Sequence, residues 1–153
     1  MVVSLLSSPE HNQRIDALAE RFAGVPIVID HLGHPAIGAK RSDSQMRQLL
    51  GLSRHPHVLM KLSGFYHFSH EQFPYRDCWD MARAVSDTFG PERLLWGSDF
   101  PHVVPSCGYA PSLALLDEVF PQWGDRQRAA VLGGNALRLY CPCDGSNASI
   151  DRP

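Results

Sequence analysis

The amino-acid sequence predicts an α/β protein whose strands form a parallel sheet. Four short apolar runs recur along the chain, and segments with apolar residues at helical spacing lie between them. The second run, 26–29, is rich in β-branched residues and shows no polar alternation, which is typical of a strand buried on both faces. We therefore expect strands at residues 2–6, 26–29, 58–62 and 93–97.

The helices are predicted from their start and stop signals. Ser8 and Pro9 suit the N-cap and the first helical position of a helix that ends near Gly24. Ser42 and Gln45 have the spacing of a capping box, which would open a second helix. Further helices are expected at about residues 74–89, 112–120, 126–132 and 136–140.

The spacing of the strands narrows the fold class. Val28, Leu59 and Leu95, at the strand centres, lie 31 and 36 positions apart, and a (β/α)8 TIM barrel of ~250 residues uses roughly 31 per unit. Four such units would leave two open sheet edges, and no charged or proline-guarded edge strand is evident. We therefore interpret residues 1–140 as part of a (β/α)8 barrel within a larger whole, and residues 141–153 as a polar, flexible tail.

Composition excludes several classes of protein. A formal charge of −2 without long runs of one sign gives no support for binding nucleic acid or a membrane surface. The apolar N-terminus is too short for a signal peptide and lacks a basic region, and no stretch is long enough to span a bilayer. Four cysteines do not suggest a disulfide scaffold, so a reducing, cytoplasmic setting is expected.

The reactive groups of parallel α/β proteins gather at the carboxyl ends of strands. Asp99 follows the fourth apolar run directly and is the main catalytic candidate. It can act as a general base on water or ligate a divalent metal. A turn-forming aspartate is an equally good reading of its position alone.

His31 is the second catalytic candidate, because it stands with Asp30 and His34 at the end of the second strand. A histidine there can shuttle protons, donate to substrate or ligate metal. The alternative is a buried histidine bonded to a backbone carbonyl.

Other residues at the strand ends are candidates for binding substrate. Lys61 shares a strand face with Ser63, and its charge is expected to point into a polar lumen. The remaining candidates are polar or aromatic side chains that are otherwise explained as solvated or packing groups: His34, Tyr66, His67 and His102.

Four sequence blocks in this order resemble the amidohydrolase-2 group of the amidohydrolase superfamily, TIM-barrel hydrolases that include 2-pyrone-4,6-dicarboxylate lactonase and sugar lactonases. The blocks are Pro-Ile-Val-Ile-Asp-His-Leu-Gly-His-Pro (26–35), Lys-Leu-Ser-Gly-Phe-Tyr (61–66), Glu-Arg-Leu-Leu-Trp-Gly-Ser-Asp-Phe-Pro-His (92–102) and Gly-Asn-Ala-Leu-Arg-Leu-Tyr (134–140). The resemblance covers roughly residues 2–140.

The resemblance implies that the chain is the C-terminal half of the barrel, with strands five to eight and their helices. His31 would match the strand-six histidine, and Asp99 the strand-eight aspartate that activates water. Both would ligate a divalent metal such as zinc if one is bound, although metal-free catalysis also occurs in the group. The substrate would be a small lactone or carboxylate.

The sequence also departs from the group's pattern. The His-x-His pair of strand one has no counterpart, and the segment 2–6 has no histidine. His67 and His34 stand near places where relatives carry arginine, which puts a dicarboxylate substrate in doubt.

Three functions remain open at this stage. The first is a hydrolase that acts on a lactone or another carboxylic ester or amide. The second is a non-oxidative decarboxylase of the same group. The third is an inactive fragment, or a half-barrel that needs a partner: a second copy in a homodimer, or a missing N-terminal half.

Overall fold

A computed structural model of the chain describes residues 1–141, so the predicted tail, 141–153, lies outside the described residues except for Cys141. The sheet has four parallel strands in the order β1-β2-β3-β4, which confirms the parallel α/β prediction. The strands are β1 (Val3–Leu5), β2 (Ile27–Ile29), β3 (Val58–Leu62) and β4 (Leu94–Trp96).

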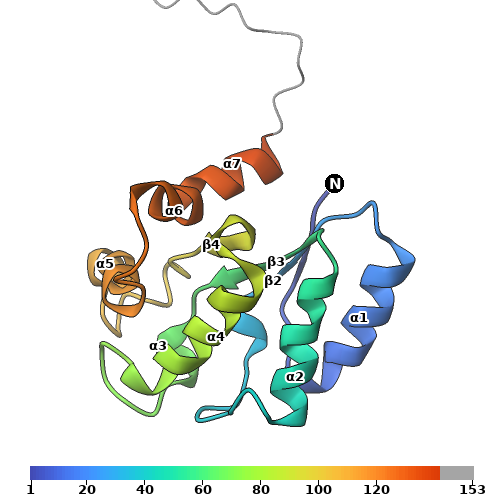
Figure 1. Cartoon of the computed structure of the whole chain (residues 1–153). Helices are drawn as coiled ribbons and strands as arrows, with labels where there is room; N and C mark the ends of the chain where they lie inside the picture. Colours follow the sequence, from blue (N-terminus) through green and yellow to red (C-terminus); the bar gives the residue numbers. More distant parts are fainter. Residues whose placement is uncertain (142–153) are drawn as a thin grey trace, which may run out of the picture.

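Seven α-helical segments follow or connect the strands in the described part of the chain (Figure 1). They are α1 (Asn12–Arg21), α2 (Ser44–Gly51), α3 (Phe65–Phe68), α4 (Trp79–Phe89), α5 (Tyr109–Val119), α6 (Asp125–Ala129) and α7 (Asn135–Tyr140). Within residues 1–141, none of the helices is long and apolar enough to cross a membrane.

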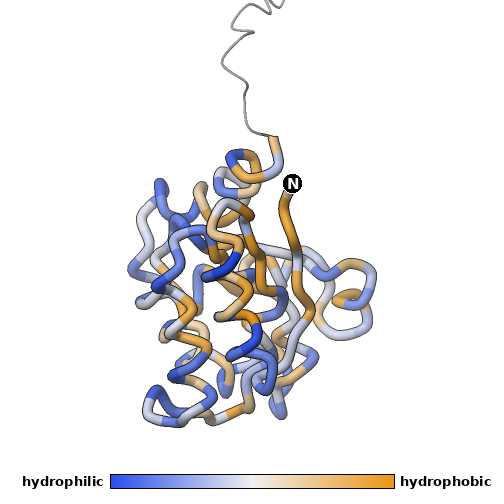
Figure 2. The backbone as a smooth tube through the Cα atoms, turned by 90° about the vertical axis from the view of Figure 1, so that its right-hand side faces the viewer, coloured by the Kyte–Doolittle hydropathy of each residue, from blue (hydrophilic) through white to orange (hydrophobic). Residues whose placement is uncertain are grey.

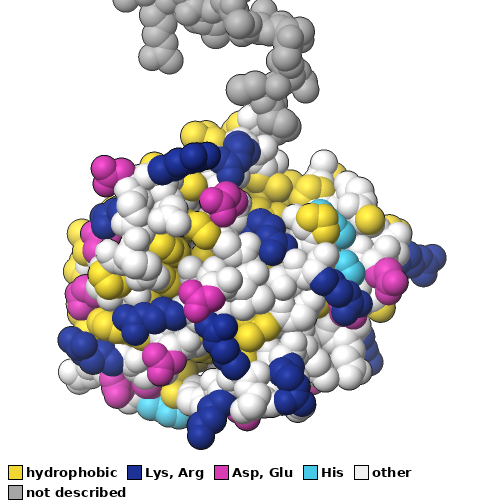
Figure 3. Space-filling view, in the orientation of Figure 1, with side chains coloured by type: hydrophobic (Ala, Val, Ile, Leu, Met, Phe, Trp, Pro, Cys, Tyr) yellow, Lys and Arg dark blue, Asp and Glu magenta, His cyan; other side chains and the backbone are white. Residues whose placement is uncertain are grey.

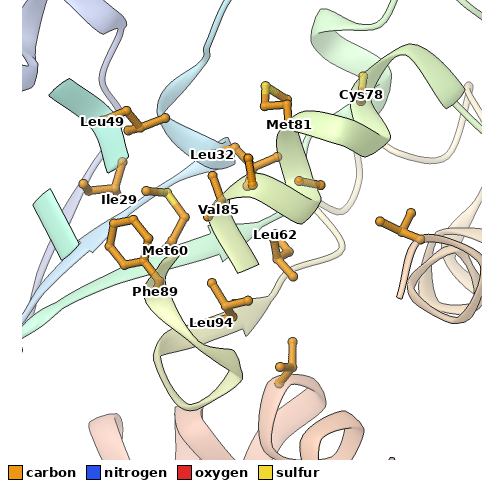
Figure 4. Packing of buried hydrophobic residues seen from close by; sticks show 14 of the residues in the cluster. Ile29, Leu32, Leu49, Met60, Leu62, Cys78, Met81, Val85, Phe89 and Leu94 are labelled. Atoms are coloured by element: carbon orange, nitrogen blue, oxygen red, sulfur yellow. The ribbon is translucent and has the colours of Figure 1, made fainter. Parts of the chain in front are cut away.

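The core lies between one face of the sheet and the helices α2 and α4. Figure 4 shows side chains of β2, β3 and β4 meeting those of the two helices. Alternate strand residues supply this face, because neighbouring residues of a strand point to opposite sides. The fully buried members include Ile29, Leu32, Leu49, Met60, Leu62, Val85 and Leu94.

The other face of the sheet carries the second set of alternate residues. Val28 and Leu95 are buried on it, whereas Ser4 of β1 is exposed and Leu59 and Lys61 are half-buried. This face continues into the polar groups at the strand ends, since Lys61 and Ser63 are two residues apart.

The two outer strands, β1 and β4, each pair with one neighbour within the described residues. Figure 2 shows that most residues from the N-terminus through β1 are hydrophobic, and Leu6 just after β1 is 72% exposed. The helical side differs, because basic and acidic side chains are interspersed over it (Figure 3). The outer strand β1 and Leu6 therefore expose apolar residues that a neighbouring strand would cover in a closed sheet.

The predicted first helix begins as expected. Ser8 is extended at the N-cap position of a 3-10 turn, Pro9–His11, with Pro9 as its first residue, and this turn runs into α1. The predicted start of the second helix was wrong by one residue. Asp43, not Ser42, is the N-cap residue of α2, because the Asp43 carboxylate accepts the amide of Lys40 and closes a turn there.

The predicted helix from residue 74 was also wrong at its start. Tyr75 has a left-handed backbone (φ 57°), which no helix interior tolerates, and a 3-10 turn, Arg76–Cys78, precedes α4. Helix α5 begins three residues earlier than predicted. The two helices expected near the C-terminus form one helical run, because α6 and α7 are joined by a π-helical segment, Ala130–Gly134, with Gly134 in helical conformation.

Asn135 ties this C-terminal run to the sheet. Its side-chain amide is buried and donates to the carbonyl oxygens of Pro91 (2.7 Å) and Leu94 (2.6 Å), at the entry to β4. Its Oδ1 accepts from Arg138, which is exposed. The carbonyls at the start of β4 are thus satisfied from a distant helix.

We predict that Asn135→Ala lowers the free energy of unfolding by about 2–4 kcal/mol, because two carbonyls lose their donor and each unsatisfied group costs roughly 1–3 kcal/mol. Urea or thermal denaturation measures the change. Arg138→Ala is the control, since it removes only the exposed partner of Asn135 and should change stability by less than about 1 kcal/mol. Equal small effects in both variants would contradict the anchoring role of Asn135.

Candidate active site

The carboxyl ends of β2, β3 and β4 meet at one edge of the sheet and surround an open hollow of about 430 Å³. Parallel pairing in register places these ends side by side. The described residues that line the hollow are Leu6, His31, His34, Tyr66, His67, Asp99 and His102. The structure thus brings together every predicted site residue except Lys61.

Asp99 and His31 face each other across this hollow. The distance from Asp99 Oδ2 to His31 Nε2 is 3.9 Å, an ion-pair distance rather than a hydrogen bond. The Tyr66 hydroxyl donates to the same Asp99 oxygen at 2.5 Å. Both acidic and imidazole side chains are mostly buried, with side-chain exposures of 24% and 18%. One carboxylate, one imidazole and one phenol therefore form a contiguous group.

Unusual backbone conformations aim the two main side chains. Asp99 has a φ of 56°, and His31, Leu32 and His34 have φ values of 51°, 55° and 48°. Each such non-glycine residue costs about 1–2 kcal/mol in this region, and such strain concentrates at functional sites. Burial of the Leu32 side chain stabilises the turn at the end of β2.

Two glycines allow the histidine turn to pack closely. A Cβ on Gly33 would lie 2.8 Å from Leu49 of α2, and a Cβ on Gly64 would lie 2.7 Å from His31 Nδ1. Both glycines also have positive φ. The imidazole of His31 therefore rests directly on the backbone after β3, a contact that only glycine permits.

Ser63 is a residue of this site that the sequence analysis did not select. Its buried hydroxyl lies 2.8 Å from His31 Nδ1 and so fixes the orientation of the ring. A signal was present, because Ser63 lies two residues after Lys61 and so points to the same face of the sheet. What the sequence lacked was the partner, since His31 is 32 positions away.

Three of the four histidines that line the hollow are in ring contact with one another. His34 packs edge-on against His31 and His67, with ring centroids 5.3 Å and 5.5 Å apart. His34 Nδ1 donates to the carbonyl oxygen of Ser7, which follows β1. His102 lines the hollow from the segment after β4.

Lys61 lies beneath the site instead of lining the hollow. Its ammonium forms an ion pair with Asp30, and both side chains are mostly buried. The absence of a side chain on Gly97 leaves room for the lysine stem, because a Cβ there would lie 3.0 Å from Lys61 Cδ. The predicted inward orientation of Lys61 fits this pairing, but Asp30 neutralises its charge.

The environment shifts two pKa values in the group. Burial lowers the pKa of His31 below its ordinary value, and the nearby Asp99 carboxylate only partly offsets this effect. Burial and donation to Asp99 raise the pKa of Tyr66 above its ordinary value. At neutral pH the imidazole of His31 is therefore neutral and the phenol of Tyr66 is protonated.

The described residues alone do not make a metal site. No group of three or more His, Cys, Asp or Glu side chains converges on one point within residues 1–141. His31 and Asp99 supply at most two ligands, and Tyr66 already donates to one Asp99 oxygen. A structural or catalytic zinc site takes at least three protein ligands. The residues present therefore do not fit a complete metal centre.

The structure is thus that of a parallel α/β protein with Asp99 and His31 at the carboxyl ends of its strands, the edge where such proteins gather their reactive groups. The chain belongs to the amidohydrolase family, whose model matches residues 8–141. This confirms the resemblance found in the sequence.

Several of the similar proteins are named lactonases or hydrolases. L-fucono-1,5-lactonase from Burkholderia ambifaria is 36% identical over 97% of this chain and 50% of its own length. 4-sulfomuconolactone hydrolase from Hydrogenophaga intermedia is 34% identical over 82% of this chain and 43% of its own length. An amidohydrolase from Burkholderia multivorans, solved with bound zinc, superposes with a TM-score of 0.79 at 28% identity, covering 91% of this chain and 52% of its own. The chain spans about half the length of the curated relatives it matches.

We predict that His31 titrates below the ordinary histidine value of about 6.5, because burial disfavours its charged form. NMR titration of the imidazole signals measures this pKa. In Asp99→Asn it should fall further, because the variant removes the negative charge that favours imidazolium. A His31 pKa at or above the ordinary value, or a rise in the variant, would contradict the assignment.

Proposed function

We propose that the complete protein hydrolyses a lactone, with Asp99 as the general base and His31 as the group that stabilises the carbonyl oxygen. The supporting observation is the convergence of Asp99, His31 and Tyr66 in one hollow at the strand ends. The lactonase names of the relatives support the same reaction class.

In this mechanism Asp99 takes a proton from a water molecule, and the water oxygen attacks the lactone carbonyl carbon. The tetrahedral intermediate carries its negative charge next to His31. Its collapse breaks the ring carbon–oxygen bond, and protonated Asp99 returns the proton to the leaving alkoxide. The product is an open-chain hydroxy acid.

Ser63 supports the role assigned to His31. If the Ser63 hydroxyl donates to Nδ1, the neutral imidazole carries its proton on Nε2, on the side of Asp99 and the hollow. The low pKa keeps the ring neutral, so it acts as a hydrogen-bond donor rather than as a permanent charge. Tyr66 holds one Asp99 oxygen by its hydroxyl and leaves the other for water.

The lining of the hollow favours a neutral, hydroxyl-bearing lactone. Among its described residues are four histidines and one aspartate, with no lysine or arginine. Dicarboxylates and sulfonates are usually held by guanidinium or ammonium groups. We therefore place sugar-type lactones ahead of dicarboxylate lactones, with His34, His67 and His102 as hydrogen-bonding groups for the substrate hydroxyls. A divalent metal such as zinc would need ligands from outside residues 1–141.

Asp99→Asn should lower kcat for lactone hydrolysis about 100- to 10,000-fold, the usual contribution of a positioned general base. A pH-indicator assay with a sugar 1,5-lactone measures the acid released. The control is Asp125→Asn, which changes an exposed carboxylate at the start of α6.

Near-normal turnover in Asp99→Asn would remove the central assignment. Product analysis separates the alternative reaction, because a decarboxylase releases carbon dioxide and a lactonase releases a hydroxy acid. The two reactions place the same demands on Asp99 and His31, so the product decides between them.

We also propose that β1–β4 correspond to strands five to eight of a (β/α)8 barrel, completed by an N-terminal half. Their sequential order, the two outer strands with one neighbour each and the half-length match to the relatives support this proposal. Two copies of the chain closing on each other are the alternative.

The 153-residue chain by itself should therefore not behave as an active monomer of 17.0 kDa. Size-exclusion chromatography with light scattering should find larger species, because two open sheet edges promote association. A discrete dimer with lactonase activity would favour pairing of two copies. A monodisperse, active 17.0 kDa monomer would contradict the half-barrel proposal.

A further inference from the structure

The segments after β3 and β4 together provide four residues of the hollow: Tyr66, His67, Asp99 and His102. The relative position of the two segments therefore decides the geometry of the site. One link between them lies inside the hollow, the hydrogen bond from Tyr66 to Asp99. A second link lies outside it, where the hydroxyls of Tyr75 and Ser106 are 2.5 Å apart.

Tyr75 is held in position because its side chain is buried. It lies between α3 and α4, it is only 3% exposed, and it holds the left-handed φ of 57°. That conformation costs about 1–2 kcal/mol for a non-glycine residue, so packing and hydrogen bonding of the side chain must offset it. Burial also raises the pKa of the Tyr75 phenol to about 12, so the hydroxyl stays protonated.

Ser106 is connected to Asp99 through a short backbone chain. Val103 donates its amide to the Asp99 carbonyl at 3.2 Å, and the Val103 carbonyl accepts the amides of Ser106, Cys107 and Gly108. Val103 itself is buried. A displacement of Ser106 would therefore reach Asp99, whose backbone is already in a left-handed conformation.

Tyr75 also lies close to Tyr66, the residue that donates to Asp99. A narrow gap between the two segments is lined by Tyr66, Tyr75, Trp96, Val103 and Cys107, among others. Tyr66, which donates to Asp99, and Tyr75, which pairs with Ser106, therefore line the same gap. Val103 and Cys107 of the segment after β4 line it as well.

We propose that Tyr75 and Ser106 are positioning residues for the reaction: their hydrogen bond holds the segment after β4 against the segment after β3 and so keeps Asp99 in place. The inference rests on the proposed role of Asp99 as general base. Neither Tyr75 nor Ser106 lines the hollow where substrate would bind.

The test is a double-mutant cycle with Tyr75→Phe and Ser106→Ala in the catalytically active protein. Each variant should lower kcat about 10-fold with KM changed less than about 2-fold, because small misplacements of a catalytic group slow the reaction more than they weaken binding. The double variant should be no slower than either single variant, since both remove the same bond. Ser106→Thr keeps a hydroxyl and should retain most of the activity.

Tyr140→Phe is the matched control, because it removes a phenol hydroxyl from a half-exposed side chain on α7. Its turnover should equal that of the unchanged protein. Unchanged kcat in Tyr75→Phe, or fully additive losses in the double variant, would overturn the positioning role even if Asp99→Asn is inactive.

Hydrogen exchange separates this inference from the proposed function. Peptides covering residues 98–108 should exchange faster in Tyr75→Phe and remain unchanged in Tyr140→Phe. If no lactone is hydrolysed but this exchange difference appears, the proposed function fails and the link between the segments remains. Equal exchange in all variants overturns the link itself, whatever the substrate.

Discussion

In-register pairing of the parallel strands β2, β3 and β4 sets the geometry of both the core and the candidate site. It brings the carboxyl ends of three separate strands to one edge, so that His31, Ser63 and Asp99 meet although they lie more than 30 residues apart. The core between the sheet and α2 and α4 holds this pairing, because it buries alternate residues of every central strand. The stability of the sheet and the geometry of the site therefore have the same origin.

Left-handed backbone conformations at the ends of β2 and β4 then orient the side chains of His31 and Asp99. The left-handed residues after β2 and β4 turn His31 and Asp99 toward each other, and Gly64 lets the imidazole lie against the backbone after β3. Such conformations are unfavourable in isolation, and the buried Leu32 and the close contact of Gly33 with α2 maintain one of them. Packing in the core thus offsets the cost of the left-handed conformations that position His31 and Asp99.

The charged groups in and near the site largely offset one another. Asp30 neutralises Lys61 beneath the hollow, while burial keeps His31 neutral and Asp99 remains the acidic group at its side. A carboxylate next to a neutral imidazole suits activation of water next to a polarised carbonyl.

The four parallel strands could be predicted from the sequence, and so could the amidohydrolase relationship and the strand ends that carry Asp99 and His31. Apolar periodicity and motif order are local properties of the chain. It misplaced the starts of α2 and α4, since Asp43 and Tyr75 adopt turns that depend on their own contacts. Three pairings could not be predicted from the sequence: Tyr66 donates to Asp99, Ser63 orients His31, and Asp30 neutralises Lys61. Those pairings join residues distant along the chain, and three-dimensional packing alone sets their distances.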